Sequence, residues 1–316
     1  MPAIAYLNRL LPGLQPLLKY RAEDWPHDFS AGLSVAAVSI PVAIAYAEVA
    51  GLSPSAGLYS SVLPMIVYAL AGTSRQMIIG PDAATCAMIA AVVAPLAAGN
   101  SGVYLSFSIA LTLLTGIFCI AASFLRLGGL ADFLARPILV GLLNGISLSI
   151  MVGQVGKVLG SKGQASRFFR QILEIPELVL QAHVPTVLLS LGCVLVMSVM
   201  PRLSKRIPAS LVTMILAALA AYSLRLDEMG VALIGPVASG LPTLDWPELQ
   251  LHEVGDLAGS AAGLGLVLFT SGMLTARSFA ERNRYDIDVD REFAAFGMAN
   301  IVSALSQGFA VTGSSS

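Results

Sequence analysis

The sequence is short of charge. Aspartate, glutamate, lysine and arginine make up 12% of its 316 residues, whereas hydrophobic residues make up 56%. Soluble domains carry about twice that share of charged residues. The formal net charge is −1, so the chain lacks the basic excess that nucleic-acid binding requires. This composition excludes an ordinary soluble domain and gives no reason to expect a nucleic-acid partner.

Cysteine and histidine are also scarce. The three cysteines lie far apart within apolar runs and show no metal-ligand spacing: Cys86, Cys119 and Cys193. The three histidines lie at or outside the ends of such runs: His27, His183 and His252. The apolar runs hold no Ser/His or paired-Asp constellation. We therefore predict buried thiols rather than disulfides, no metal, no cofactor and no enzymatic activity.

What the sequence does have is a series of long, uncharged, apolar runs. Each is long enough to cross about 30 Å of hydrocarbon. The runs are Ser30–Ala47, Val49–Ser74, Ala83–Leu125, Pro137–Gly156, Val184–Pro201, Ile207–Leu224 and Leu257–Ala276. The sequence therefore predicts an all-α polytopic membrane protein, preceded by a surface segment at residues 1–28.

Dividing the longer runs at turns gives about nine crossings. They are expected at 29–49, 54–71, 82–98, 103–125, 137–159, 184–200, 209–224, 257–277 and 292–308. Pro41 should kink or unwind the first crossing, because proline leaves the carbonyl of Ala37 without a helical donor. Lysine and arginine are more frequent in the segments that face the cytoplasm if the N-terminus is inside, which favours that orientation. The amphipathic connection 161–183 is an exception to this rule, because it carries lysine and arginine although this orientation places it outside.

The stretch Met77–Ala87 differs from the other apolar runs. Extended residues lead into Gly80-Pro81, and a helical pattern starts at Asp82. Proline suits the first turn of a helix and pushes the residue before it towards an extended conformation. A helix that starts inside the bilayer offers free N–H groups and about half a positive charge to an anion. We predict a half-helix with an anion seat; the alternative is that Gly80-Pro81 ends a cytoplasmic loop and a full span follows.

The two halves of the chain show a similar spacing. Asp28 and Asp82 are separated by nearly the same distance along the chain as Asp256 and Thr312. Breaks at matching depth in two halves are typical of transporters with inverted repeats and a midplane binding site. The spacing is a hint of that architecture.

Short motifs follow one another in a specific order. In the first half they are Pro41-Val-Ala-Ile-Ala-Tyr-Ala47, Ala50-Gly-Leu-Ser-Pro54, Gly57-Leu-Tyr59, Gly72-Thr-Ser-Arg-Gln76 and Gly80-Pro81. In the second half they are Asp288-Val-Asp-Arg-Glu292, Gly297-Met-Ala-Asn300 and Thr312-Gly-Ser-Ser-Ser316. Together they strongly resemble the sulfate permease (SulP) family of anion transporters, from about Trp25 to Ser316.

The resemblance implies an inverted-repeat (7+7) fold, divided into a core and a gate domain and followed by a cytoplasmic STAS domain. The sequence stops where the tenth span would begin, so we expect about nine spans plus the start of the tenth, without a STAS domain. The expected parts are 29–126 and 257–316 in the core, 127–226 in the gate, and 227–256 as an extracellular link. The resemblance also implies a homodimer in the cell inner (plasma) membrane.

In this family the anion lies between the N-termini of the third and tenth helices, flanked by the first and eighth. Two facing termini contribute about one positive charge in total, which can hold an anion without lysine or arginine. The matching positions here are Val42, Tyr46, Asp82, Ala83, Ala84, Thr85, Ser271, Thr275, Gly313, Ser314, Ser315 and Ser316. Asn300 is expected to bridge helices. Without the resemblance, residues 312–316 would be interpreted as a disordered tail.

Several of these residues have two interpretations. Asp82 could cap its helix or carry a proton, since an ionised carboxylate would repel the anion. Tyr46 could cover the site or only pack at a helix interface. Glu48, near the outer end of the first span, is a second coupling candidate, although its position also suits a solvated side chain. Val42 replaces a glutamine that is frequent in the family, so a polar contact is lost there. Ser271 replaces a frequent carboxylate, which argues against a sodium or proton site on the eighth span and leaves coupling to Asp82 or Glu48; sodium is the less expected coupling ion.

These observations predict a secondary active transporter of small oxyanions: sulfate, bicarbonate or a dicarboxylate. Transport would proceed by alternating access, coupled to protons. One alternative is a nucleobase permease of the same fold, which Ser271 argues against because that chemistry calls for a carboxylate there. The other alternative is a membrane scaffold that transports nothing.

Overall fold

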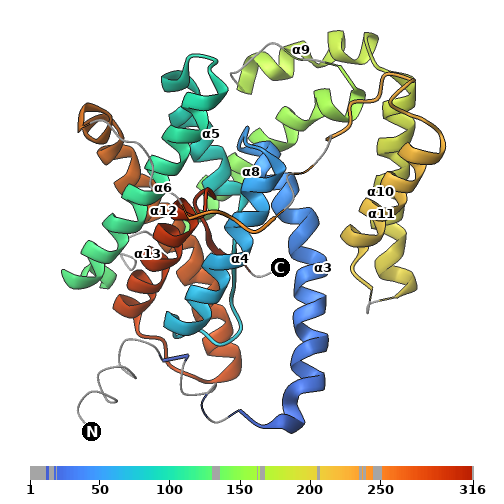
Figure 1. The fold of residues 1–316 in the computed structure, drawn as a ribbon. Helices are drawn as coiled ribbons and strands as arrows, with labels where there is room; N and C mark the ends of the chain where they lie inside the picture. The colour runs from blue at the N-terminus through green and yellow to red at the C-terminus, as the bar shows by residue number, and fades with distance from the viewer. Residues whose placement is uncertain are drawn as a thin grey trace, which may run out of the picture. The chain divides into compact units, whose positions relative to one another are not determined.

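The computed structural model describes residues 12–13, 18, 20–129, 136–161, 163, 168–204, 207–234, 237, 240–244 and 251–314. Within these residues the protein is helical, with a single two-stranded sheet (Figure 1). The described elements are η1 (Ala22–Asp24), α3 (Trp25–Val49), α4 (Pro54–Ala71), β1 (Ile78–Gly80), α5 (Ala83–Ala97), α6 (Ser101–Phe124), η2 (Leu127–Gly129), α8 (Arg136–Leu159), α9 (Phe168–Leu180), α10 (Val184–Leu203), α11 (Ala209–Ser223), α12 (Leu251–Asn283), α13 (Val289–Leu305) and β2 (Thr312–Ser314).

Each of the nine predicted crossings falls on a helix. Five helical segments of the described chain are long and apolar enough to cross a membrane: Ala22–Val49, Pro54–Ala71, Ser101–Phe124, Val184–Leu203 and Gly255–Asn283. The helices α5 and α11 are apolar but shorter. The chain is therefore a multi-pass membrane protein.

Three predicted details differ from the structure. α3 continues through Pro41 as one helix, so of the two predicted outcomes, a kink or an unwound turn, the unwound turn does not form; proline removes one donor, and the turns on either side keep their own bonds. α12 begins at Leu251, inside the expected link, because a helix can extend beyond its apolar run. α13 ends at Leu305, earlier than expected, because the chain becomes extended before β2.

Local sequence explains where several helices begin. The side chain of Asn100 accepts hydrogen bonds from Gly102 N (3.0 Å) and Val103 N (3.3 Å) at the start of α6. Asp288 Oδ1 accepts from Arg291 N at 3.2 Å at the start of α13. Such caps satisfy amides that have no acceptor within the helix.

The chain divides into two compact units. The first comprises Met1–Ala31, Ala43–Gly141 and Ala238–Ser316, and the second comprises Gly32–Val42 and Leu142–Val237. The second unit includes the packed pair α10 and α11, which lines an apolar cavity of about 630 Å³. All three cysteines are free; two are buried as predicted, whereas Cys193 on α10 is partly exposed.

The core of the first unit surrounds α13. This helix packs against both α4 and α6, although the sequence separates them widely (Figure 1). A Cβ added at Gly116 of α6 would lie 2.8 Å from the carbonyl oxygen of Gly297 on α13, and one at Gly297 would lie 2.7 Å from that of Gly116. The two backbones therefore approach as closely as small residues allow in membrane helices.

Candidate functional site

The two extended segments of the chain, β1 before α5 and β2 near the end of the described chain, are called lead-ins here and form one antiparallel ribbon. Ile78 of β1 lies opposite Ser314 of β2, and Ile79 lies opposite Gly313. Non-helical backbone at membrane depth must find internal partners, and each strand supplies them to the other. Thr312–Ser314, which would be interpreted as a disordered tail without the family resemblance, forms a strand that pairs with a segment from the other half of the chain.

The helix that follows β1 is a half-helix. α5 has 15 residues, which corresponds to about 22 Å, whereas the hydrocarbon core is about 30 Å thick. The break at Gly80-Pro81 is present as predicted, with β1 directly before it. The alternative of a loop followed by a full span is therefore wrong.

Asp82 caps this half-helix through a capping box. Its Oδ1 accepts from Thr85 N at 2.8 Å and from Thr85 Oγ1 at 2.7 Å, and Asp82 N faces Thr85 Oγ1 at 3.4 Å. The next two amides, of Ala83 and Ala84, belong to the first turn, where a helix supplies no acceptor of its own; the Ala84 amide bonds the Asp82 carboxylate as well. Ala83 is partly exposed, whereas Ala84 and Thr85 are buried. The N-terminus of α5 therefore offers backbone donors together with one carboxylate.

The second strand is anchored on α12. Thr312 Oγ1 donates to the carbonyl oxygen of Leu268, which lies one turn before Ser271. Ser271 and Thr275 are partly buried on the same helix, and Thr275 Oγ1 donates to the Ser271 carbonyl at 3.3 Å. α12 also contacts α5. The structure thus brings together the third-helix, eighth-helix and ribbon positions predicted from the sequence.

The first-helix positions are more scattered. Tyr46 packs against the core cluster that contains Ile79, and its phenol is within electrostatic range of Asp82. Glu48 is exposed, and Val42 belongs to the second compact unit. Ser315 and Ser316 lie outside the described residues.

The assembled positions have the chemistry of a small-anion seat. The described residues among them include no lysine or arginine, so the positive potential comes from the α5 N-terminus. Ser271 on α12 and Ser314 on β2 carry partly exposed hydroxyls. α12 contacts α5, and β2 pairs with β1, the strand that precedes α5. Backbone amides with hydroxyls can bind an oxyanion without side-chain cations.

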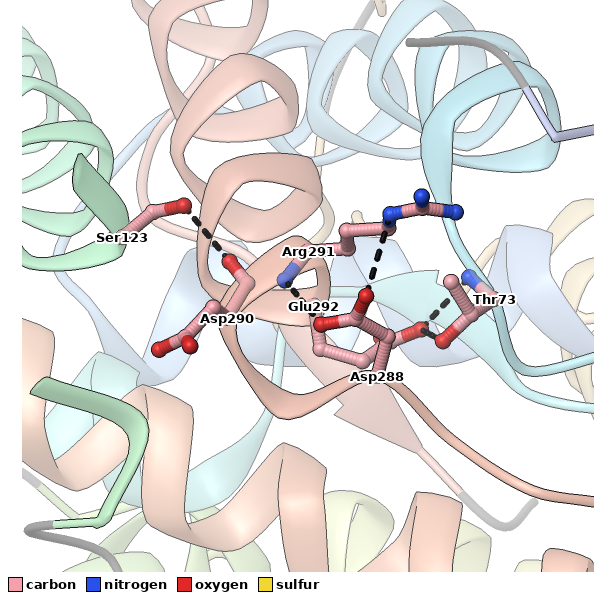
Figure 2. A network of polar contacts seen from close by, with 6 residues as sticks. All are labelled: Thr73, Ser123, Asp288, Asp290, Arg291 and Glu292. Carbon is pink, nitrogen blue, oxygen red and sulfur yellow. Dashed lines mark hydrogen bonds and ion pairs between the residues drawn. The ribbon is translucent and has the colours of Figure 1, made fainter. Parts of the chain in front are cut away.

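Sequence reasoning did not identify Glu292 as a site-building residue. This fully buried carboxylate accepts from Tyr68 Oη (2.7 Å), Thr73 N (2.6 Å), Thr73 Oγ1 (2.6 Å) and Ser74 N (2.9 Å). Figure 2 shows it directed from the first turn of α13 towards Thr73, in the loop that precedes β1. The sequence did place a carboxylate at the start of a predicted span, which could have drawn attention to Glu292, because ionisable residues in membrane spans usually have a specific role.

Asn300 does not bridge two helices as expected. Its side-chain amide donates to Val311 O at 3.0 Å and accepts from Val311 N at 2.9 Å, and so pairs with the extended backbone before β2. Nearby, Ser303 Oγ donates to Phe309 O at 2.7 Å, and Phe309 N donates to Ser60 Oγ at 2.8 Å. The side chains of Asn300, Ser303 and Ser60 thereby provide hydrogen-bond partners for backbone groups of the extended chain that leads into β2.

Comparisons with known proteins agree with this geometry. A model of the sulfate permease family matches residues 26–316. The chain is 39% identical over 305 residues to a probable sulfate transporter of Mycobacterium tuberculosis, covering 96% of this chain and 54% of that protein. It is 32% identical over 337 residues to low affinity sulfate transporter 3 of Stylosanthes hamata, covering 99% and 52%. The chain spans about half the length of the curated relatives it matches.

Solved structures show the same fold. The structure of the murine solute carrier 26 family member A9 anion transporter in the inward-facing state matches with a TM-score of 0.88 at 22% identity, over 99% of this chain and 55% of that one. The transmembrane domain of a cyanobacterial bicarbonate transporter, BicA, matches with a TM-score of 0.81 at 24% identity, over 93% and 76%. The inverted-repeat transporter fold predicted from the sequence is thereby confirmed.

Proposed function

Since this chain belongs to the sulfate permease family, we propose that it forms the anion-binding part of a secondary active transporter of small oxyanions. The observation that carries the proposal is the paired ribbon β1–β2, directly after which α5 starts with a partly exposed first residue, Ala83. The binding positions are Tyr46, Asp82, Ala83, Ala84, Thr85, Ser271, Thr275, Gly313 and Ser314, with Val42, Ser315 and Ser316 included on the family pattern alone.

Sulfate is the first candidate substrate. The relatives at 39% and 32% identity are both named as sulfate transporters. Recognition by backbone dipoles is compatible with other small oxyanions, so bicarbonate and a dicarboxylate remain in the proposed substrate class. A nucleobase is disfavoured, because Ser271 supplies no carboxylate to pair with ring N–H groups.

We propose that anion binding is coupled to a proton at Asp82. The carboxylate stands at the α5 N-terminus, where it would repel an incoming anion unless it were protonated. The titratable side chains around it are Tyr46 from α3 and Cys86 from α5 itself. Glu48, the other candidate, is exposed on α3 and is less well placed.

The proposed setting is a homodimer in the cell inner (plasma) membrane, in contact with lipid and with the N-terminus in the cytoplasm. Residues 29–126 and 257–316 would form the core, 127–226 the gate, and 227–256 an outer link. Alternating access would then move the core against the gate.

The test is transport by the complete protein in liposomes. Uptake of labelled sulfate, bicarbonate and fumarate would be measured with and without a pH gradient. We expect saturable sulfate uptake that an acidic outside medium accelerates. Absence of flux for all three anions would favour a membrane scaffold instead.

A matched pair of variants examines the seat itself. Ala83→Asp adds a second carboxylate to the first turn of α5 and should lower the apparent sulfate affinity about tenfold or more through like-charge repulsion. Ser101→Glu adds the same charge at an exposed position in the first turn of α6 and should leave uptake unchanged. Equal effects of both variants would argue against a seat at α5.

A further inference from the structure

A single buried face of α13 touches the approach to both strands of the ribbon. Glu292, Phe296, Asn300 and Ser303 follow one another at helical spacing, and all four are fully buried. At one end of this face, Glu292 holds the loop before β1. At the other end, Asn300 and Ser303 hold the extended chain before β2.

The contact at Glu292 is complete. All four groups that approach its carboxylate are donors: the Tyr68 hydroxyl, the Thr73 hydroxyl, and the amides of Thr73 and Ser74. Glu292 therefore acts as a fixed hydrogen-bond partner for this loop.

The contact at Asn300 imitates a strand. Its amide donates to and accepts from the same residue, Val311, as an opposed residue in an antiparallel ladder would do. Asn300 also donates to the Phe296 carbonyl at 2.8 Å, which fixes its side chain on the helix. The last residue before β2 is thereby held at one position along α13.

Between the two contacts, Phe296 prevents α13 from sliding. Its ring lies 5.7 Å from that of Tyr68 on α4. A Cβ added at Gly272 of α12 would come within 2.3 Å of the same ring. The middle of the face is thus wedged between the helices that flank the two lead-ins.

We propose that α13 is a positioning element that sets the register of β1 against β2, and through it the place where α5 begins. Glu292 and Asn300 are its positioning residues. The inference deepens the proposed function, because the register fixes the anion seat, but the register can be measured without any transport.

Disulfide trapping in the full-length protein in its membrane reports the register. Opposed residues of an antiparallel pair lie about 4.5–5.5 Å apart at Cα, within disulfide range. Ile78→Cys with Ser314→Cys probes the observed register, and Ile78→Cys with Thr312→Cys probes a two-residue slip. Mild oxidation is followed by mass spectrometry of the linked peptides, which separates these bonds from the three native cysteines.

Glu292→Gln replaces an acceptor oxygen by a donor that faces other donors, and Asn300→Leu removes the strand-like pairing. Each should lower the ratio of in-register to slipped cross-link about fivefold or more, as loss of a buried hydrogen bond implies. Arg291→Ala is the control, because Arg291 makes a partly exposed ion pair with Asp288 on the same turn (Figure 2). It should leave the ratio unchanged.

Milder variants decide the matter if Glu292→Gln does not fold. Tyr68→Phe and Thr73→Val each remove one hydroxyl donor from Glu292 and should lower the ratio in the same direction, by less. An unchanged ratio in every folded variant would overturn the proposal. A changed ratio in a protein that moves no anion would uphold the positioning role while the transport function failed.

Discussion

At the scale of single residues, Asp82 combines two roles that substitution can separate. Its carboxylate accepts two hydrogen bonds from Thr85, which is the chemistry of a helix cap. The same carboxylate stands where an anion would bind, which is the reason to assign it a proton. Asparagine retains an oxygen that can cap but cannot be ionised, whereas alanine retains neither property.

We predict that Asp82→Asn removes the pH dependence of sulfate uptake but leaves the protein about as stable as the parent, because asparagine caps as well as aspartate. Asp82→Ala should also lose about 1 kcal/mol of stability. Uptake at several external pH values and thermal unfolding in detergent measure the two effects. An acid-stimulated uptake that persists in Asp82→Asn would show that the proton is carried elsewhere.

At the scale of elements, the ribbon has one crowded glycine and one open glycine. A Cβ at Gly313 would lie 2.1 Å from Met77 Sδ, and Met77 is itself buried. A Cβ at Gly80 would meet nothing closer than Ser61 Oγ at 4.0 Å. The same substitution should therefore have different consequences in the two strands.

Gly313→Ala should destabilise the protein by about 1–3 kcal/mol, the usual cost of overpacking, and should weaken sulfate binding by displacing β2. Gly80→Ala is the matched control and should be close to neutral. In a Met77→Ala background, which removes the clashing side chain at its own cost in stability, adding Gly313→Ala should cost little further. Thermal unfolding and sulfate titration provide the measurements; a neutral Gly313→Ala would mean that Met77 moves aside without cost.

Local chemistry explains why the half-helix could be predicted and the ribbon could not. The adjacent residues Gly80, Pro81 and Asp82 together favour the start of a helix, so the position of that start could be predicted from the sequence. Each strand has only three residues, too few to show an alternating pattern, and its partner lies in the other half of the chain. Thr312–Ser314 therefore had no local signal of order.

The same distinction applies to Glu292 and Asn300. Both lie in motifs noted in the sequence, and the first was placed at the start of a span. Their partners, Thr73 and Val311, are set by how α13 packs. Only the tertiary structure could reveal that these residues hold the lead-ins, since a motif gives residue types and spacing but no contacts.

At the scale of the whole molecule, the two halves of the chain depend on each other. The first half supplies β1 and α5, and the second supplies β2, α12 and α13, so neither half contains the proposed seat alone. This interdependence is typical of inverted-repeat transporters, in which the site lies at the repeat interface. A mutation in either half should therefore affect the same site.

The orientation of the chain in the membrane can be tested with two exposed positions. Lysine and arginine predict that the segment after α12 is cytoplasmic and that the turn after α11 is external. Arg282, in the last turn of α12, and Glu228, in the turn after α11, are both exposed. Arg282→Cys should react with a membrane-impermeant maleimide only after permeabilisation, and Glu228→Cys should react in intact cells.

Cys193→Ser is used as the background for both variants, since Cys193 is the partly exposed native cysteine. The lysines and arginines of the connection 161–183 oppose the assignment, so the charge rule favours it without proving it. The reverse labelling pattern would place the N-terminus outside. Neither the inverted-repeat fold nor the proposed seat depends on the orientation, so that result would change only which face of the protein an anion outside the cell meets first.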